Sequence, residues 1–88
     1  MSRRLIDMSV EDARQAKWEA GVLEHGPVFR HEPIEEFDLE MLDALNYCDE
    51  AQRQGYPESR LEVLRCLIRS ALVLGREIYR DRRREARP

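Results

Sequence analysis

The strongest constraint on the fold is an acidic, amphipathic stretch in the middle of the chain, EEFDLEMLDALNY at residues 35–47. Successive residues of an α-helix are 100° apart, so two separate stripes form along it. The apolar stripe contains Ile34, Phe37, Met41, Leu45 and Cys48. The acidic stripe contains Glu36, Glu40, Asp43, Tyr47 and Glu50, all within about 40° of one line. The pattern predicts a helix that buries one face, and it leaves open whether the acidic stripe is only solvated or binds a cation.

Start and stop residues bound this helix and predict another after it. Pro33 suits the first position of a helix, and Gly55 suits the end of one. Pro57 then opens a third helix, which is the most hydrophobic of the three. Its broad apolar surface contains Leu61, Leu64, Leu67 or Ile68, Ala71, Leu72, Leu74 or Gly75, and Ile78. A surface of this width predicts that a second copy of the chain helps to cover it.

A further helix is predicted before the acidic one. Ser9 followed by Asp12 resembles a capping box, so this helix should begin at about Val10. It should end at about Glu24, because Gly26-Pro27 follows. The expected organisation is a flexible arm over residues 1–8, a single helical domain over residues 9–80 and a basic tail over residues 81–88.

The length of the chain favours association. Eighty-eight residues bury a small core, and small domains of this kind often gain stability as dimers. We therefore expect an all-α, three-helix subunit that completes a larger helical bundle as a homodimer. No apolar run is long enough to span a membrane, so we expect a cytoplasmic protein without a membrane partner. Cys48 and Cys66 lie in apolar helical patterns and are expected to be buried, reduced thiols.

Charge is distributed unevenly along the chain. The net charge is −3, but residues 32–62 carry ten acids against Arg53 and Arg60, a local balance of −8. From residue 76 onward, six arginines face three acids, a local balance of +3. A nucleic-acid-binding domain of this size usually carries a broad basic face, so a nucleic-acid partner is not expected. The acidic middle favours cations or a basic partner.

A family resemblance sharpens the cation hypothesis. Glu35-Glu36, the spacing Glu40-x-x-Asp43 and the run LDALNY at 42–47 resemble the metal-binding helix of the MazG-like superfamily of all-α nucleoside triphosphate pyrophosphohydrolases. Small phage and mobile-element members are the most similar in style, over roughly residues 14–50. The resemblance implies a helical, usually dimeric enzyme. In that superfamily Mg²⁺, held by E-x-x-D carboxylates, binds the triphosphate and activates water, which yields a nucleoside monophosphate and pyrophosphate.

The resemblance also implies roles for particular residues. Glu40 and Asp43 match the E-x-x-D ligands, with Glu36 as an additional ligand of Mg²⁺, or of Mn²⁺ as the substitute. The E-E-x-x-E motif that the superfamily carries on its preceding helix has no counterpart here. Candidate contacts to a nucleotide are Asn46, Lys17, Arg65 and Arg69. No catalytic residue is assigned.

Two uses remain open for the arginines of the third helix. Arg65, Arg69 and Arg76 form a basic stripe that either pairs with the acidic stripe of the second helix or holds phosphate oxygens. The alternative to an enzyme is a non-enzymatic, homodimeric helical module whose acidic face binds a basic partner. The two hypotheses differ in what the acidic stripe meets in the assembled protein.

Overall fold

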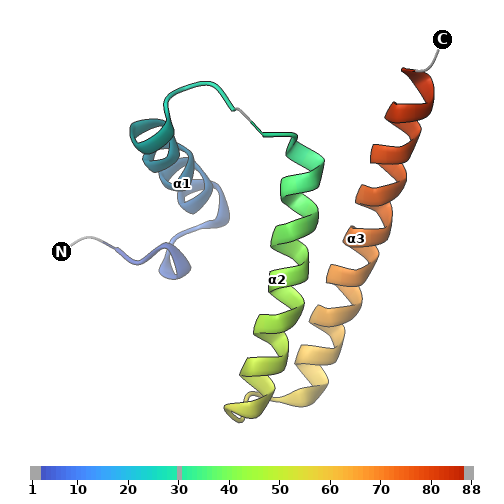
Figure 1. The fold of residues 1–88 in the computed structure, drawn as a ribbon. Coiled ribbons are helices and arrows are strands. Elements are labelled where there is room, and N and C mark those ends of the chain that lie inside the picture. Colours follow the sequence, from blue (N-terminus) through green and yellow to red (C-terminus); the bar gives the residue numbers. More distant parts are fainter. Residues whose placement is uncertain (1–2, 30, 87–88) are drawn as a thin grey trace. The chain divides into compact units, whose positions relative to one another are not determined.

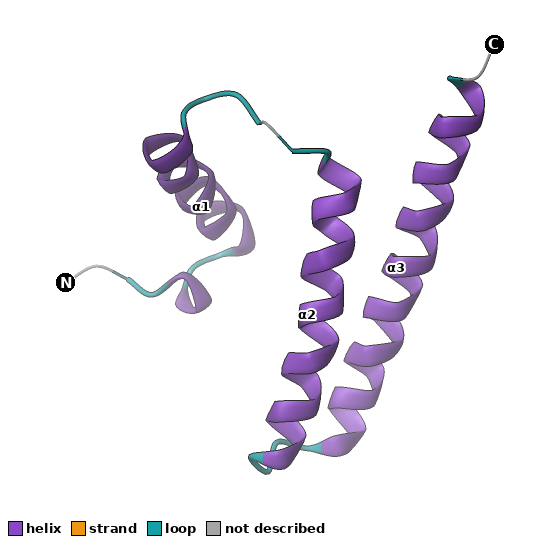
Figure 2. Ribbon diagram, in the orientation of Figure 1, coloured by secondary structure: helices purple, strands orange, loops and turns teal. Residues whose placement is uncertain are grey.

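The computed structural model describes residues 3–29 and 31–86, and all regular structure in them is helical (Figures 1 and 2). A short 3-10 helix, η1 (Leu5–Asp7), precedes α1 (Val10–His25), α2 (Pro33–Arg53) and α3 (Glu58–Glu85). The predicted all-α subunit of three α-helices is confirmed for this part of the chain. None of its helices is both long enough and apolar enough to cross a membrane.

The chain divides into two compact units between residues 30 and 31. The expectation of one domain over residues 9–80 therefore stays a prediction, and each unit is considered separately. In the first unit, the Ser9 hydroxyl accepts a hydrogen bond from the backbone N–H of Asp12 at 3.2 Å, as the capping pattern predicts. Gly26, with φ of 86°, ends α1 one residue later than expected. Residues 5–7 of the predicted arm form η1, while residues 1–2 lie outside the described part.

The second unit is an antiparallel hairpin of α2 and α3 (Figure 1). The Glu32 side chain caps the start of α2 by accepting a hydrogen bond from the Glu35 backbone N–H at 2.6 Å. At the other end of α2, Gly55 has a φ of 93°, which a non-glycine residue rarely adopts. The Tyr56 backbone N–H then bonds to the Ala51 carbonyl at 3.0 Å, which closes the turn into α3.

The core of the hairpin is small. Its buried apolar residues are Cys48, Leu61, Ile68 and Leu72. Partly buried Met41, Ala44, Leu45 and Ala51 pack against them. The open alternatives on the third helix are thereby resolved, since Ile68 and Gly75 are buried whereas Leu67 and Leu74 are exposed.

Gly75 has a specific packing role. A Cβ atom at this position would lie 3.1 Å from Cε1 of Phe37, closer than ordinary van der Waals contact. The glycine therefore lets the Phe37 ring lie directly against the backbone of α3.

One prediction about the thiols is wrong. Cys48 is buried at 3% exposure, as expected, but Cys66 is exposed. The reason is geometric, because Cys66 lies about 140° around α3 from the buried line through Leu61 and Leu72. Its neighbours in the sequence are apolar without facing the core.

One side of the hairpin, here called the polar edge, is held by arginines of α3 and acids of α2. Arg65 is only 8% exposed and bonds to Asp49 at 3.0 Å, and also to Gln52 and Glu62. Of the two uses left open for Arg65, ion pairing with the second helix is the one observed. Its interhelical partner Asp49, however, lies outside the acidic stripe.

Arg76 makes the second interhelical ion pair of the polar edge. It donates two hydrogen bonds to Asp38, at 2.7 and 3.1 Å. Asp38 also lies outside the acidic stripe, so both ion pairs leave that stripe unused.

The other side of the hairpin presents apolar side chains to solvent. This apolar edge is formed on α3 by Leu64, Leu67, Ala71, Leu74 and Ile78. The four large side chains among them are 45–64% exposed. The apolar edge lies about 100° around α3 from the buried line, on the side where Phe37 packs over Gly75. The hairpin thus has one edge held by ion pairs and one whose large apolar side chains are exposed.

Candidate functional site

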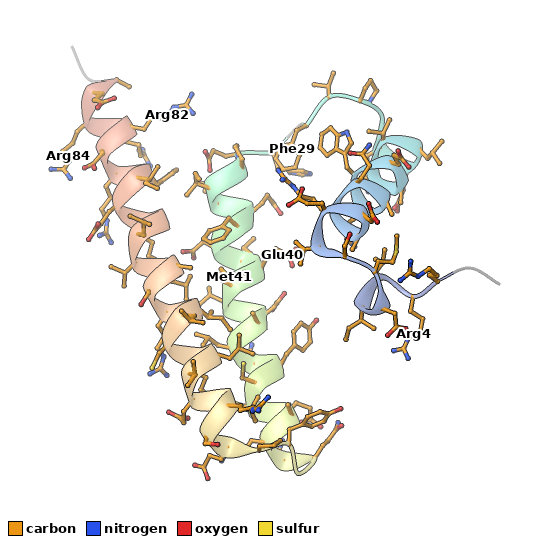
Figure 3. The ribbon with its side chains drawn as sticks, turned by 180° about the vertical axis from the view of Figure 1, so that it is seen from behind. Arg4, Phe29, Glu40, Met41, Arg82 and Arg84 are labelled. Carbon is orange, nitrogen blue, oxygen red and sulfur yellow. The ribbon has the colours of Figure 1, made fainter. Side chains whose placement is uncertain are left out.

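The acidic stripe lies on an unbroken helix, because α2 runs from Pro33 to Arg53. Glu36 is partly exposed, while Glu40 and Asp43 are exposed. Figure 3 shows Glu40 and Met41 leaving α2 on different sides, with Met41 packed on the core. The predicted separation of the acidic and apolar faces is therefore realised.

These carboxylates have the right chemistry for Mg²⁺ but are not spaced to hold one ion together within one chain. Mg²⁺ prefers hard oxygen ligands at about 2.1 Å. Glu36 and Asp43 are seven residues apart, so their backbones are separated by about 10 Å along the helix axis. One ion cannot be held by all three carboxylates at this spacing. In agreement, the described residues contain no group of three or more His, Cys, Asp or Glu side chains that could hold a metal ion.

The two ends of the acidic stripe already have partners. At the start, His31 Nδ1 lies 3.8 Å from Glu36 Oε1, an ion pair when the imidazole is protonated. At the far end, Glu50 accepts hydrogen bonds from Arg53 and from Gln54. The bond from Arg53 lowers the pKa of Glu50 and so favours its charged form. Glu40 and Asp43, at the centre of the stripe, are the members best exposed to an incoming cation.

The candidate nucleotide contacts are not all alike. The guanidinium of Arg65 is surrounded by its three partners on the polar edge, where its role in the fold is clear. Arg69 and Asn46 are exposed on α3 and α2, respectively. Lys17 is exposed on α1 and belongs to the first unit. Their suggested contacts to a nucleotide stay predictions.

A groove of about 650 Å³ lies between α2 and α3 near the start of α2, and sequence reasoning missed it. Its walls carry opposite charges. The α2 wall contains Ile34, Glu35, Glu36, Asp38 and Leu39. The α3 wall contains Arg76, Tyr79, Arg80 and Arg83. The spacing of Arg76, Arg80 and Arg83 places them on one face of α3. The acids of α2 that lie opposite this face are known only from the structure of the hairpin.

Tyr79 joins the two walls of the groove. Its hydroxyl donates to Glu35 at 2.7 Å and accepts a hydrogen bond from Arg83 at 3.1 Å. The hydrogen bond to the Glu35 carboxylate raises the pKa of Tyr79, because it stabilises the neutral phenol. The Arg83 guanidinium also lies 5.5 Å from the centre of the Tyr79 ring. Together with the Asp38–Arg76 pair, these contacts link the two walls of the groove through opposite charges.

No protein-family model, curated protein or solved structure matches this chain.

Proposed function

We propose that the chain acts as a homodimer, binds Mg²⁺ or Mn²⁺ on the acidic stripe, and hydrolyses a nucleoside triphosphate to its monophosphate and pyrophosphate. The observation that carries this proposal is the exposure of Glu40 and Asp43 on an unbroken α2. With Glu36, they supply the oxygen ligands that Mg²⁺ prefers. When bound, the ion would neutralise phosphate charge and lower the pKa of a bound water.

The homodimer supplies what the single chain lacks. Within one chain the three carboxylates form one wall and are too far apart to surround an ion. Glu40 points about 100° away from the core-facing line of α2, toward the same side of the hairpin as the apolar edge. A second copy packed on the apolar edge would therefore bring its own side chains close to Glu40. Such a dimer buries apolar surface and supplies a second wall in one step.

Pyrophosphate release tests the activity directly. The protein should release pyrophosphate from at least one nucleotide in a panel of ribo- and deoxyribonucleoside triphosphates with Mg²⁺ or Mn²⁺. Glu40→Gln and Asp43→Asn should each remove the activity while leaving the helical content unchanged. Glu77→Gln, which neutralises an exposed acid on α3, is the matched control and should retain it. No release from any nucleotide with either metal would reject hydrolysis.

The second candidate is a non-enzymatic homodimeric module whose acidic face binds a basic partner. It is favoured by the lack of a three-ligand group among the described side chains, combined with the exposed apolar edge. In this case the carboxylates of the stripe are solvated and serve only as a negatively charged surface.

Metal-dependent stability separates the two candidates. An ion at 10 to 100 times its Kd stabilises a protein by about 1.4–2.7 kcal/mol. For a domain of this size that amounts to an increase in Tm of roughly 5–15 °C. The metal site predicts such a shift with Mg²⁺ or Mn²⁺ and its loss in Glu40→Gln/Asp43→Asn. The interaction module predicts the same small ionic-strength effect for Mg²⁺ as for an equivalent concentration of Na⁺.

A further inference from the structure

Helix α3 has two apolar faces, and only one of them packs against α2. The buried face contains Leu61, Ile68 and Leu72. The apolar edge, Leu64, Leu67, Ala71, Leu74 and Ile78, follows alternating spacings of three and four residues. This spacing is typical of a helix that packs along its length against another helix. The apolar edge is therefore shaped for a long helical partner.

The partner must present a matching stripe, and α1 does not. Its large apolar side chains do not form one stripe, since Val10 and Leu23 lie about 70° to either side of the line through Ala13 and Ala20, whereas Trp18 and Val22 lie about 150–170° from that line. In the part of the chain that the structure describes, the one other stripe of this length is on α2, and it is already used in the core. A second copy of α3 provides the missing stripe.

We infer that the apolar edge is covered by the same edge of a second copy whose α3 runs antiparallel and crosses at Ala71. This inference rests on the proposed homodimer and specifies its geometry. The apolar positions lie at −7, −4, 0, +3 and +7 from Ala71, so reversing the helix reproduces the pattern to within one residue. Leu64 then lies opposite Ile78, Leu67 lies beside Leu74, and the small side chain of Ala71 allows a close crossing.

Charges at the ends of the apolar edge favour the antiparallel direction. The line of the edge continues to Arg60 at the start of α3, and to Asp81, Arg82 and Glu85 near its end. Antiparallel packing brings Arg60 of each copy to the two acids and one arginine at this end of the other copy, a group of net negative charge. Parallel packing would place like charges together. Asp81 also pairs with Arg84 at 2.7 Å in its own helix, where both side chains are exposed and can accept a further partner.

The arginines at the end of α3 add to this preference. Arg80, Arg82, Arg83 and Arg84 lie within the last two turns of the helix. Parallel packing would align this cluster with its copy, whereas antiparallel packing moves the two clusters to opposite ends of the dimer. Antiparallel helices also place opposite ends of their dipoles together.

The register of the hairpin shows what else meets at the crossing. Asp49 pairs with Arg65 and Asp38 pairs with Arg76, so Ala71 is level with residue 43 on α2. A crossing at Ala71 therefore brings Glu40 of one copy close to Glu40 of the other. Because these like charges repel across the symmetry axis, Glu40→Gln should strengthen association in metal-free buffer. Glu77→Gln, away from the axis, should leave association unchanged.

Distances between spin labels test the direction of the helices. We would use the whole chain with Cys66→Ser and Ser59→Cys, so that the label attaches near the start of α3 while Cys48 stays buried. Ser59 is 12 residues from Ala71, and 24 residues of helix span about 36 Å. Antiparallel packing thus predicts a separation of about 36 Å between labels. Parallel packing predicts less than about 20 Å, set by the distance between adjacent helices and the label arms.

Sedimentation equilibrium of the unlabelled protein completes the test. Dimer mass with the longer separation supports the inference. Dimer mass with the shorter separation overturns the antiparallel geometry but leaves the proposed homodimer intact. Monomer mass at all concentrations overturns both.

As a charge test, Arg60→Glu should raise the dimer Kd by roughly tenfold through its two symmetric contacts, and adding Asp81→Lys and Glu85→Lys should restore it. Equal Kd values for wild type and Arg60→Glu would exclude the end contacts.

Discussion

At the scale of single residues, Gly75 sets how closely α2 and α3 approach. A Cβ atom there would meet the Phe37 ring at 3.1 Å, but the ring is 36% exposed and can shift outward. Alanine gains about 1 kcal/mol of helix propensity over glycine, which offsets a small displacement of the ring. Close packing at Gly75 is therefore limited by side chains larger than a methyl group.

Substitutions at Gly75 should show this limit. Gly75→Ala should leave the free energy of unfolding within about 1 kcal/mol of wild type, whereas Gly75→Leu should lower it by about 2–3 kcal/mol through overpacking. Urea unfolding followed by circular dichroism measures both. Ser70→Leu, on the exposed side of α3, is the control and should have little effect. A Gly75→Leu protein as stable as Ser70→Leu would mean that the Phe37 contact does not constrain the hairpin.

Asp38 makes the stability of the hairpin depend on pH. The hydrogen bond from Arg76 lowers the pKa of Asp38 below its ordinary value of 3.8. A carboxyl with a lower pKa in the folded state stabilises the fold above its unfolded pKa, and this contribution disappears as the pH falls through the folded pKa. The contribution is thus complete at neutral pH and is lost below about pH 4.

Asp38→Asn should therefore have a lower Tm than wild type at pH 7, and the difference should shrink as the pH falls from 4 toward 2. Thermal melts across this range measure the effect. Glu77→Gln serves as the comparison, because its carboxylate lies outside the polar edge. A Tm difference for Asp38→Asn that is constant down to pH 2 would show that the Arg76 contact contributes nothing through charge.

Residue-level predictions from sequence succeed where the cause is local and fail where it is not. Ser9 caps α1, and Gly26 and Gly55 end helices, because each acts through its own backbone and nearest neighbours. Cys66 was wrongly expected to be buried, since its apolar neighbours do not reveal which side of the helix meets α2. The partners of Arg65 depend on the hairpin register, which the turn sets and the helical pattern alone does not.

At the scale of helices, α1 differs from the hairpin helices in having no buried residue. Its backbone hydrogen bonds are therefore protected mainly by the helix itself, and an isolated 16-residue helix is marginally stable in water. The hairpin helices share a packed core, so their amides should open together in a larger unit.

Native-state hydrogen exchange should resolve this difference. Amides in the middle of α1 should exchange at least about tenfold faster than those around Cys48 and Ile68, corrected for intrinsic rates. Mass spectrometry of peptic fragments makes the measurement, and fragments from the exposed final turns of α3 provide an internal reference for fraying. Equal protection in α1 and in the centre of the hairpin would show that α1 is held by contacts as extensive as theirs.

The groove between α2 and α3 could not be predicted from the sequence, because it depends on which residues of the two helices lie opposite each other. Glu35 and Tyr79 are 44 positions apart, and nothing in either local pattern indicates that they meet. The acidic stripe was found because its members share one helix. A site formed by one helix can be predicted from the periodicity of its sequence. A site formed between two helices can be predicted only if the register between those helices is known.

At the scale of the whole molecule, the helical class follows from sequence because three helical segments are bounded by serine, proline and glycine, and two of them carry a clear amphipathic pattern. The assembly does not follow so directly. The breadth of the third helix indicates unmet apolar surface, yet the choice between Leu67 and Ile68 depends on contact with α2. Once Ile68 and Leu72 are known to face α2, Leu64, Leu67, Leu74 and Ile78 remain as the surface available for association.

Because the two thiols are unequally buried, their reaction rates report how often α2 and α3 separate. Cys66 can react with a thiol reagent in the folded state. Cys48, at 3% exposure in the hairpin core, can react only when α2 and α3 separate. The first equivalent of reagent therefore counts all chains, and the rate at which the second is consumed follows the opening of the hairpin. The native cysteines can thus be used to measure how often the core of the hairpin is exposed. The same measurement would show how far a second copy or a metal ion slows that exposure.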